Sequence, residues 1–352
     1  MIFKSFHLRN LKRALKNSEP VESNNYDSLQ AVSRAAIFSN IGQGKKLKRA
    51  INVEDFEDVP DHVLILILKL LDVNSLCTVR LVNRRLNNIV QRHHDSFAKT
   101  TLESLGLIRL PFNKANKITI ASERHTSLDS VAIALTPKQL DSALRHIRVT
   151  EHLSVENLTF TRLNCHMLQR SIANQLSRLQ LIGCRLEIGY EEFARFVGRW
   201  QVRNLTMSDC EWEDERTVGD DFFRYNSQLA AFSVQENRKT KFSCLTDATL
   251  LLWSSVINSR LPYFPQSLNL GQALSNFTAD GVGQLIEQFI KKPPNMLSPV
   301  IWNFGVVRGQ RHTLSNFLSA FPATLINSGS SELWVIFNGK STLHVRVAFE
   351  SP

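Results

Sequence analysis

The chain has 352 residues, of which 43% are hydrophobic, and this composition excludes a globally disordered protein. The net charge of +10 is concentrated in residues 1–52, which hold ten Lys and Arg against three acids, whereas residues 53–352 carry only +3. We therefore expect no nucleic-acid partner for the folded part of the chain, and no apolar run approaches the ~20 residues of a membrane span.

Residues 1–52 read as a basic and flexible extension. Its start is an amphipathic stretch that could bind an acidic membrane surface or a protein partner. A second basic cluster, Lys45-Lys46-Leu47-Lys48-Arg49, fits a nuclear import signal. The alternative is a solvated, poorly ordered tail, or an extension that binds nucleic acid while the rest of the chain does not.

Residues 53–99 read as a small module of three helices. The first begins at Pro60, where the missing N–H costs no hydrogen bond, and Val63–Leu68 is apolar on every side. Short second and third helices follow at residues 74–79 and 81–90. Because so small a module cannot cover its first helix on all sides, we expect exposed apolar side chains that either a partner or the downstream domain covers.

The order of residues in this module resembles the F-box over residues 59–86. The proline, two apolar pairs and the Leu-Val-Asn-Arg-Arg-Leu block of residues 81–86 stay in register. The resemblance implies docking on a Skp-type adaptor, which bridges to a cullin scaffold. The adaptor contacts that it implies are the proline and the exposed faces of the helices: Pro60, Val63, Leu64, Ile67, Leu68 and Val82.

A repeated pattern follows within residues 100–352. The segment Leu176-x-x-Leu179-x-Leu181-x-x-Cys184-x-Leu186 fits the leucine-rich repeat template, and the pattern recurs around Leu153, Val202 and Leu229, at a nearly constant period. The template predicts short parallel strands with inward leucines, and a Cys position that faces backbone groups of the adjacent coil. Cys184 and Cys210 are therefore structural residues and not a redox pair.

Strand and helix patterns alternate to the C-terminus. Apolar residues at helical spacing follow the strands at residues 193–200, 282–289 and 314–321. Asn338-Gly339 between two alternating segments predicts a β-hairpin, which we interpret as an end cap. The predicted class is α/β: a three-helix F-box followed by a leucine-rich-repeat-like β-α solenoid with a hairpin cap. This combination resembles the large nematode F-box family.

The sequence contains no catalytic constellation. The nucleotide-binding, metalloprotease and nucleophile-elbow motifs are absent, and the five cysteines form no C-x-x-C pair. We therefore expect neither an enzyme nor a metal or other cofactor, and a reducing compartment, either cytoplasm or nucleus.

The predicted function is substrate recognition in a Skp-cullin-F-box ubiquitin ligase, and the alternative is a non-ligase interaction scaffold. The unknown protein substrate would bind polar side chains on the open face of the strands. The candidates form two rows and are Ser154, Glu156, Gln180, Thr206, Ser208, Ser233 and Gln235.

Overall fold

The computed structural model describes residues 59–110, 118–121, 133–172, 175–235, 240–259, 265–294, 298–328 and 331–350. The basic extension lies outside them, so its expected helix and import signal stay predictions. The described residues form two compact units. Among these residues, one unit contains those up to Thr101 together with Pro137–Arg148, and the other contains those described between Leu102 and Thr136 and from Val149 onward. The predicted domain boundary at residues 99–100 stays a prediction.

The described part of the first unit is largely helical, and the sequence predicted its α-helices before residue 99 but not the one at Pro137–Leu144. Its elements are α3 (Asp61–Leu68), α4 (Val73–Val82), α5 (Arg84–Arg92), the short 3-10 helix η2 (His94–Ser96) and α6 (Pro137–Leu144). Asp72 begins α4 by accepting a hydrogen bond from Ser75 N at 2.7 Å, which lowers the pKa of the Asp72 carboxyl. The predicted third helix began at Leu81. Instead, extended backbone at Asn83 separates α4 from α5, so Leu81 and Val82 belong to α4.

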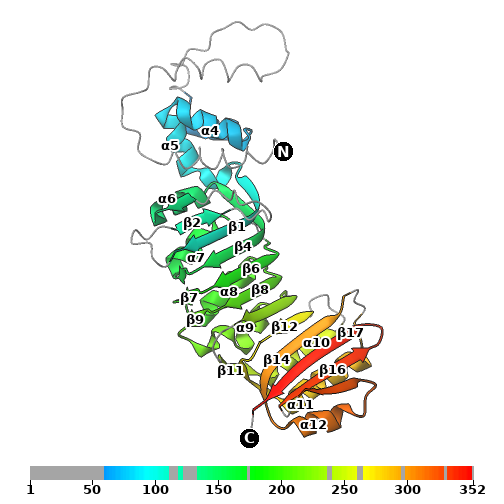
Figure 1. The fold of residues 1–352 in the computed structure, drawn as a ribbon. Coiled ribbons are helices and arrows are strands. Elements are labelled where there is room, and N and C mark those ends of the chain that lie inside the picture. Colours follow the sequence, from blue (N-terminus) through cyan, green and yellow to red (C-terminus); the bar gives the residue numbers. More distant parts are fainter. Residues whose placement is uncertain are drawn as a thin grey trace, which may run out of the picture. The chain divides into compact units, whose positions relative to one another are not determined.

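The second unit is rich in β-structure, and one sheet of 14 strands dominates the described chain (Figure 1). The strands run in the order β15-β16-β17-β14-β12-β10-β8-β6-β4-β1-β2-β3. Their bounds are β1 (Thr100–Arg109), β2 (Ile118–Ala121), β3 (Ile133–Leu135), β4 (Ile147–Glu156), β6 (Arg178–Ile182), β8 (Asn204–Ser208), β10 (Ala231–Gln235), β12 (Ser267–Asn269), β14 (Val300–Arg308), β15 (Thr324–Ser328), β16 (Glu332–Asn338) and β17 (Thr342–Phe349).

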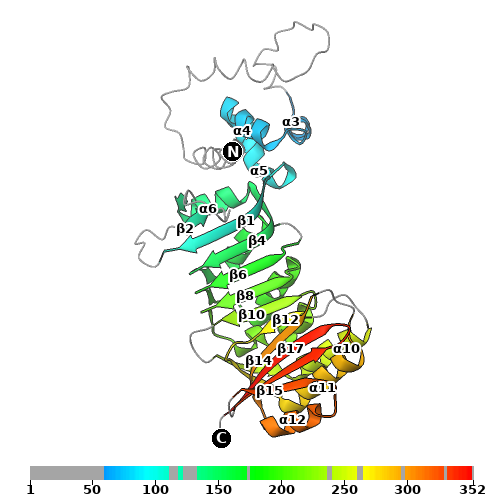
Figure 2. The same cartoon turned by 45° about the vertical axis from the view of Figure 1, so that its right-hand side comes forward.

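Smaller elements complete this unit. Strands β11 (Lys241–Thr246) and β13 (Leu274–Thr278) branch from β14, and a second sheet contains β5 (Thr159–Phe160), β7 (Arg185–Leu186) and β9 (Glu211–Trp212). The helices are α7 (Arg162–Gln169), α8 (Tyr190–Arg199), η3 (Glu215–Val218), α9 (Asp220–Tyr225), α10 (Asp247–Ser259), α11 (Ala279–Lys291) and α12 (Arg311–Leu318). The helical spacing predicted α8, α11 and α12, and Figure 2 shows β4, β6, β8 and β10 lying side by side.

The repeat spacing appears in the backbone as well as in the side chains. Strands β4, β6, β8 and β10 pair in parallel, and Leu179, Leu205 and Phe232 occupy one buried row of that register. After each of the first three strands the chain turns through a left-handed residue, at Asn157, Gly183 and Asp209, with φ of 55°, 57° and 50°. Asn, Asp and Gly tolerate this conformation best. The predicted parallel, buried strands are confirmed.

The two repeat cysteines occupy the structural position that the template predicts. The thiol of Cys184 donates to Val155 O at 3.2 Å, and the thiol of Cys210 donates to Leu181 O at 3.4 Å. Each sulfur therefore satisfies a backbone carbonyl on the preceding strand. Both cysteines are buried.

The predicted hairpin forms the C-terminal end of the sheet. Asn338 pairs with Thr342 across the turn, and β16 and β17 run antiparallel. Strand β17 also pairs in parallel with β14, which makes the hairpin a continuation of the sheet. The sequence did not predict β15, an additional antiparallel partner of β16.

Candidate adaptor-binding surface and open sheet face

One candidate surface is apolar and lies on the helices of the first unit. The core beneath it contains Leu64, Leu68, Leu76, Ile89, Val90 and Phe97. Other leucines and an isoleucine point outward, and Leu70 is 86% exposed. We call these four exposed residues the helical patch: Leu66 and Ile67 on α3, Leu70 in the turn that follows it, and Leu81 near the end of α4. Each such side chain gains roughly 1.5–3 kcal/mol when a partner buries it fully, so a partner that covers all four gains binding energy of several kcal/mol.

The predicted exposure of Leu64 and Leu68 is wrong. Leu64 is only 2% exposed, because residues four apart lie on the same side of α3 and that side faces α5. Val63 and Val82 are half-buried, whereas Pro60 and Ile67 are exposed. Whether any of these residues contacts an adaptor stays a prediction. A helical wheel places residues 64 and 68 on a different side from 66 and 70, but all four are leucines, so the wheel alone does not show which side is buried.

The Leu-Val-Asn-Arg-Arg-Leu block fixes the helices beneath the patch. Asn83 begins α5 by accepting a hydrogen bond from Arg85 N at 2.6 Å. The guanidinium of Arg85 donates to Asp61 Oδ1 at 2.6 Å and to Val59 O at 2.6 Å, which ties the start of α3 to α5. Arg80 is 7% exposed, and its Nε donates to Asn87 Oδ1 at 3.0 Å. These polar contacts join α3 and α4 to α5.

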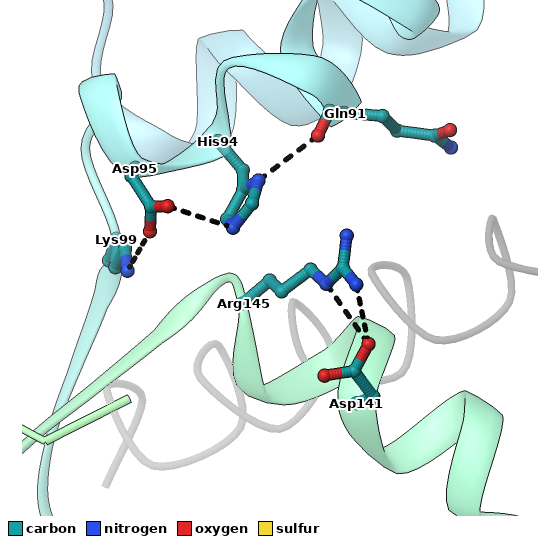
Figure 3. A network of polar contacts seen from close by, with 6 residues as sticks. All are labelled: Gln91, His94, Asp95, Lys99, Asp141 and Arg145. Atoms are coloured by element: carbon teal, nitrogen blue, oxygen red, sulfur yellow. Dashed lines mark hydrogen bonds and ion pairs between the residues drawn. The ribbon is translucent and has the colours of Figure 1, made fainter. Parts of the chain in front are cut away.

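A polar network lies in the same unit (Figure 3). His94 Nδ1 is 3.1 Å from Gln91 O, and Asp95 is 3.2 Å from the Lys99 ammonium. On the segment that includes α6, Arg145 contacts Asp141 through both Nε and a terminal nitrogen, the shorter contact being 2.6 Å. The result is a concentration of positive charge around His146, which is itself partly buried.

The partly buried His146 should make the first unit less stable as the pH falls. Burial, together with the positive charges of Arg80, His94, Lys99 and Arg145, lowers the pKa of His146 to about 4. The unfolded chain therefore binds more protons between pH 6.5 and 4, so the stability falls as the pH falls through that window. From pH 7 to pH 5 we expect the first unit to lose roughly 2 kcal/mol of stability, seen as lower hydrogen-exchange protection factors in residues 59–101 and 137–148 after the intrinsic exchange rate at each pH is taken into account.

The matched variants are His146→Gln, which should reduce this pH dependence, and His166→Gln at an exposed histidine, which should leave it unchanged. Equal pH dependence in wild type and His146→Gln would contradict the assignment.

A second candidate surface is the open face of the sheet in the second unit. Two predicted rows lie in register, the first through Ser154, Gln180, Thr206 and Ser233 and the second through Glu156, Ile182, Ser208 and Gln235. The predicted juxtaposition is confirmed, and substrate binding there stays a prediction. Ser154 differs from the expectation that these residues are accessible to a substrate, because its exposed fraction is only 2%. Its short side chain lies on β4, an inner strand between β1 and β6.

The structure extends the first row in a way that the sequence analysis missed. Ser233 pairs with Asn269, Asn269 with Asn303, and Asn303 with Arg346. The row then continues from Arg346 to Trp334 and Ile326. Alternating polar and apolar residues around the Asn-Gly turn were a signal for the hairpin, but nothing local in the sequence indicated that β17 would pair with β14.

Two other kinds of site are absent from the described ranges. No helix there is long and apolar enough to cross a membrane. No group of three or more His, Cys, Asp or Glu side chains in that part of the chain is arranged to hold a metal ion.

Comparison with known families identifies the helical module. A family model of the F-box domain matches residues 56–96, which include α3, α4 and α5. No curated protein matches the chain in sequence. The chain thus contains an F-box domain, which supports binding of a Skp-type adaptor. Proteins with this domain are typically non-catalytic substrate receptors.

Proposed function

We propose that this F-box protein is the substrate-recognition subunit of a Skp-cullin-F-box ubiquitin ligase. The observation that carries the proposal is the helical patch on a module that matches the F-box domain. Leucines that remain this exposed on a small helical module favour a protein partner. The F-box would bind the adaptor, the adaptor would bind the cullin, and the open face of the sheet would present the substrate for transfer of ubiquitin by other subunits.

The adaptor contact centres on the outward side of α3 and the end of α4. Leu66 and Leu70 offer aliphatic surface close together in the chain, and Leu81 adds a third side chain from α4. Asp61 and Arg85 would remain paired because their contact is internal to the module. Pro60, Val63 and Ile67 keep their predicted roles, whereas Leu64 and Leu68 support the patch from within.

The repeat domain is proposed to be a leucine-rich-repeat-like solenoid of the kind found in the large nematode F-box family. Four parallel strands at a nearly constant spacing and the matching left-handed turns support this proposal. A cytoplasmic or nuclear location follows from the proposed ligase role, and transfer of ubiquitin would be catalysed elsewhere in the complex. The substrate-binding residues would be those of the two polar rows that remain accessible.

The test is adaptor binding by the full chain with Leu66→Asp and Leu70→Asp combined. Both side chains are already exposed, so the charges should not enter the core. We expect at least a 100-fold loss of affinity for a purified Skp-type adaptor, about 2.7 kcal/mol, measured by calorimetry. Changing Leu64, which is buried, would instead unfold the module and would not report on binding.

Leu163→Asp is the matched control, because Leu163 is a 78% exposed leucine on α7 in the other unit. It should leave adaptor affinity unchanged. If the double variant binds the adaptor as well as wild type does while its circular dichroism is unaltered, the helical patch is not the adaptor site. If the wild-type chain fails to bind any Skp-type adaptor, the interaction-scaffold alternative replaces the ligase role.

A further inference from the structure

The open face of the sheet changes in character between its middle and its C-terminal end. In the middle, polar side chains bond to one another: Asn269 donates to Ser233 Oγ at 3.4 Å, and Asn303 donates to Asn269 Oδ1 at 2.9 Å. The same two asparagines accept hydrogen bonds from Gly271 N and Gly305 N. Their amides are therefore engaged within the sheet, which reduces what they can offer to a partner.

The last four strands present a different surface, which we call the terminal face. Strand register places its residues in two rows that point the same way. One row is Asn303, Arg346, Trp334 and Ile326, and the other is Ile301, His344, Ile336 and Thr324. Ile301, Ile326 and Trp334 are exposed, Trp334 by 38%. Aliphatic and aromatic side chains thus surround a central arginine.

Neighbouring side chains hold the guanidinium of Arg346 in one orientation, and several of its N–H groups remain available as hydrogen-bond donors. Its guanidinium carbon lies 5.5 Å from the centroid of the Trp334 ring, and one terminal nitrogen donates to Glu332 Oε1 at 2.6 Å. This ion pair lowers the pKa of the Glu332 carboxyl. A guanidinium has five N–H donors, and that of Arg346 makes no other hydrogen bond within the described part of the chain. Its side chain is 32% exposed.

This chemistry fits a carboxylate beside an apolar side chain. A planar guanidinium binds carboxylates through paired N–H donors, and stacking on Trp334 orients that plane in advance. Tryptophan and arginine are also the residues that contribute most often to binding energy at protein interfaces. A doubly charged phosphate fits less well, because Glu332 already places a negative charge against the same guanidinium.

We propose that the terminal face binds an extended, acidic-apolar peptide segment of the substrate. Asp or Glu of the peptide pairs with Arg346, and an aliphatic or aromatic residue two or three positions away packs on Trp334 and Ile326. Strands lie ~4.8 Å apart and an extended chain rises ~3.3 Å per residue, so about five residues cross from Ile301 to Ile326. The site deepens the proposed function, and it rests on that function only in taking the peptide to come from a ligase substrate.

The test uses the purified full chain, with and without a Skp-type adaptor. An immobilised library of randomised eight-residue synthetic peptides, with and without phosphoserine, is screened for binding. We expect selection of peptides with Asp or Glu two or three residues from an aliphatic or aromatic residue. In solution, Trp334→Ala and Arg346→Met should each weaken the best peptide at least tenfold. Tyr225→Ala, at an aromatic residue on α9 that is 50% exposed and has no assigned binding role, should change its affinity less than twofold.

A variant that gains affinity for a different peptide must be folded, so a charge reversal distinguishes lost recognition from misfolding. Arg346→Glu should prefer the same peptide with its acid replaced by Lys, a reversal that an unfolded variant cannot produce. The proposal is overturned if no peptide is selected, if phosphorylated or basic peptides are selected, or if the variants bind like wild type. Adaptor affinity is measured in the same samples. If the wild-type chain selects peptides but does not bind the adaptor, the ligase role is wrong and the peptide site stands. If it binds the adaptor but selects no peptide, the peptide site is wrong and the ligase role stands.

Discussion

Replacing Leu205 by Asp is expected to lower the free energy of unfolding of the second unit by about 4–5 kcal/mol, because a carboxylate would enter a packed core without a partner. Leu205 is 1% exposed and lies in register between Leu179 and Phe232 on the neighbouring strands. The variant would therefore disturb three consecutive strands. Urea denaturation followed by tryptophan fluorescence measures this unit, because all five tryptophans of the chain lie within it.

Thr206→Asp is the matched control. Thr206 follows Leu205 on the same strand, but its side chain points to the open face and is half-buried. The same new charge should cost less than about 1.5 kcal/mol there. Equal destabilisation by the two variants would show that the assignment of inward and outward positions along β8 is wrong.

Gly305→Val is expected to destabilise the same unit by about 3 kcal/mol or more, because the backbone there has a left-handed conformation that β-branched residues rarely adopt. Gly305 has a φ of 66° in the middle of β14. A Cβ at this position would lie 2.5 Å from the backbone oxygen of Ala273, and a backbone atom cannot move aside as a flexible side chain can. Urea denaturation again provides the measurement.

The control for this position is Gly189→Ala, since a Cβ at Gly189 meets nothing within 4 Å and its φ is −63°. Its effect should stay within about 1 kcal/mol. A stable Gly305→Val protein would mean that β14 can straighten at this residue, and the register shift between Asn303 and Val306 would then not depend on glycine.

The periodic part of the sheet could be predicted because a constant repeat length determines the register. When strands recur at a fixed period, Leu179 and Leu205 occupy equivalent positions, and parallel pairing brings equivalent positions together. Gln180 and Thr206 then meet for the same reason. The helical module was equally predictable, because its proline, apolar pairs and polar block are all local in the sequence.

The parts that the sequence did not predict depend on contacts between distant segments. The apolar residues of α3 look alike in the sequence, and only packing against α5 decides that Leu64 is buried while Leu66 is exposed. Likewise, Arg346 meets Trp334 across the hairpin, but pairing of β17 with β14 is what joins both to the open face. The sequence by itself determined the repeats, their register and the F-box helices, because these follow from local periodicity. Only the tertiary structure decided which apolar surfaces remain uncovered, because burial depends on which segments pack together and not on the residues alone.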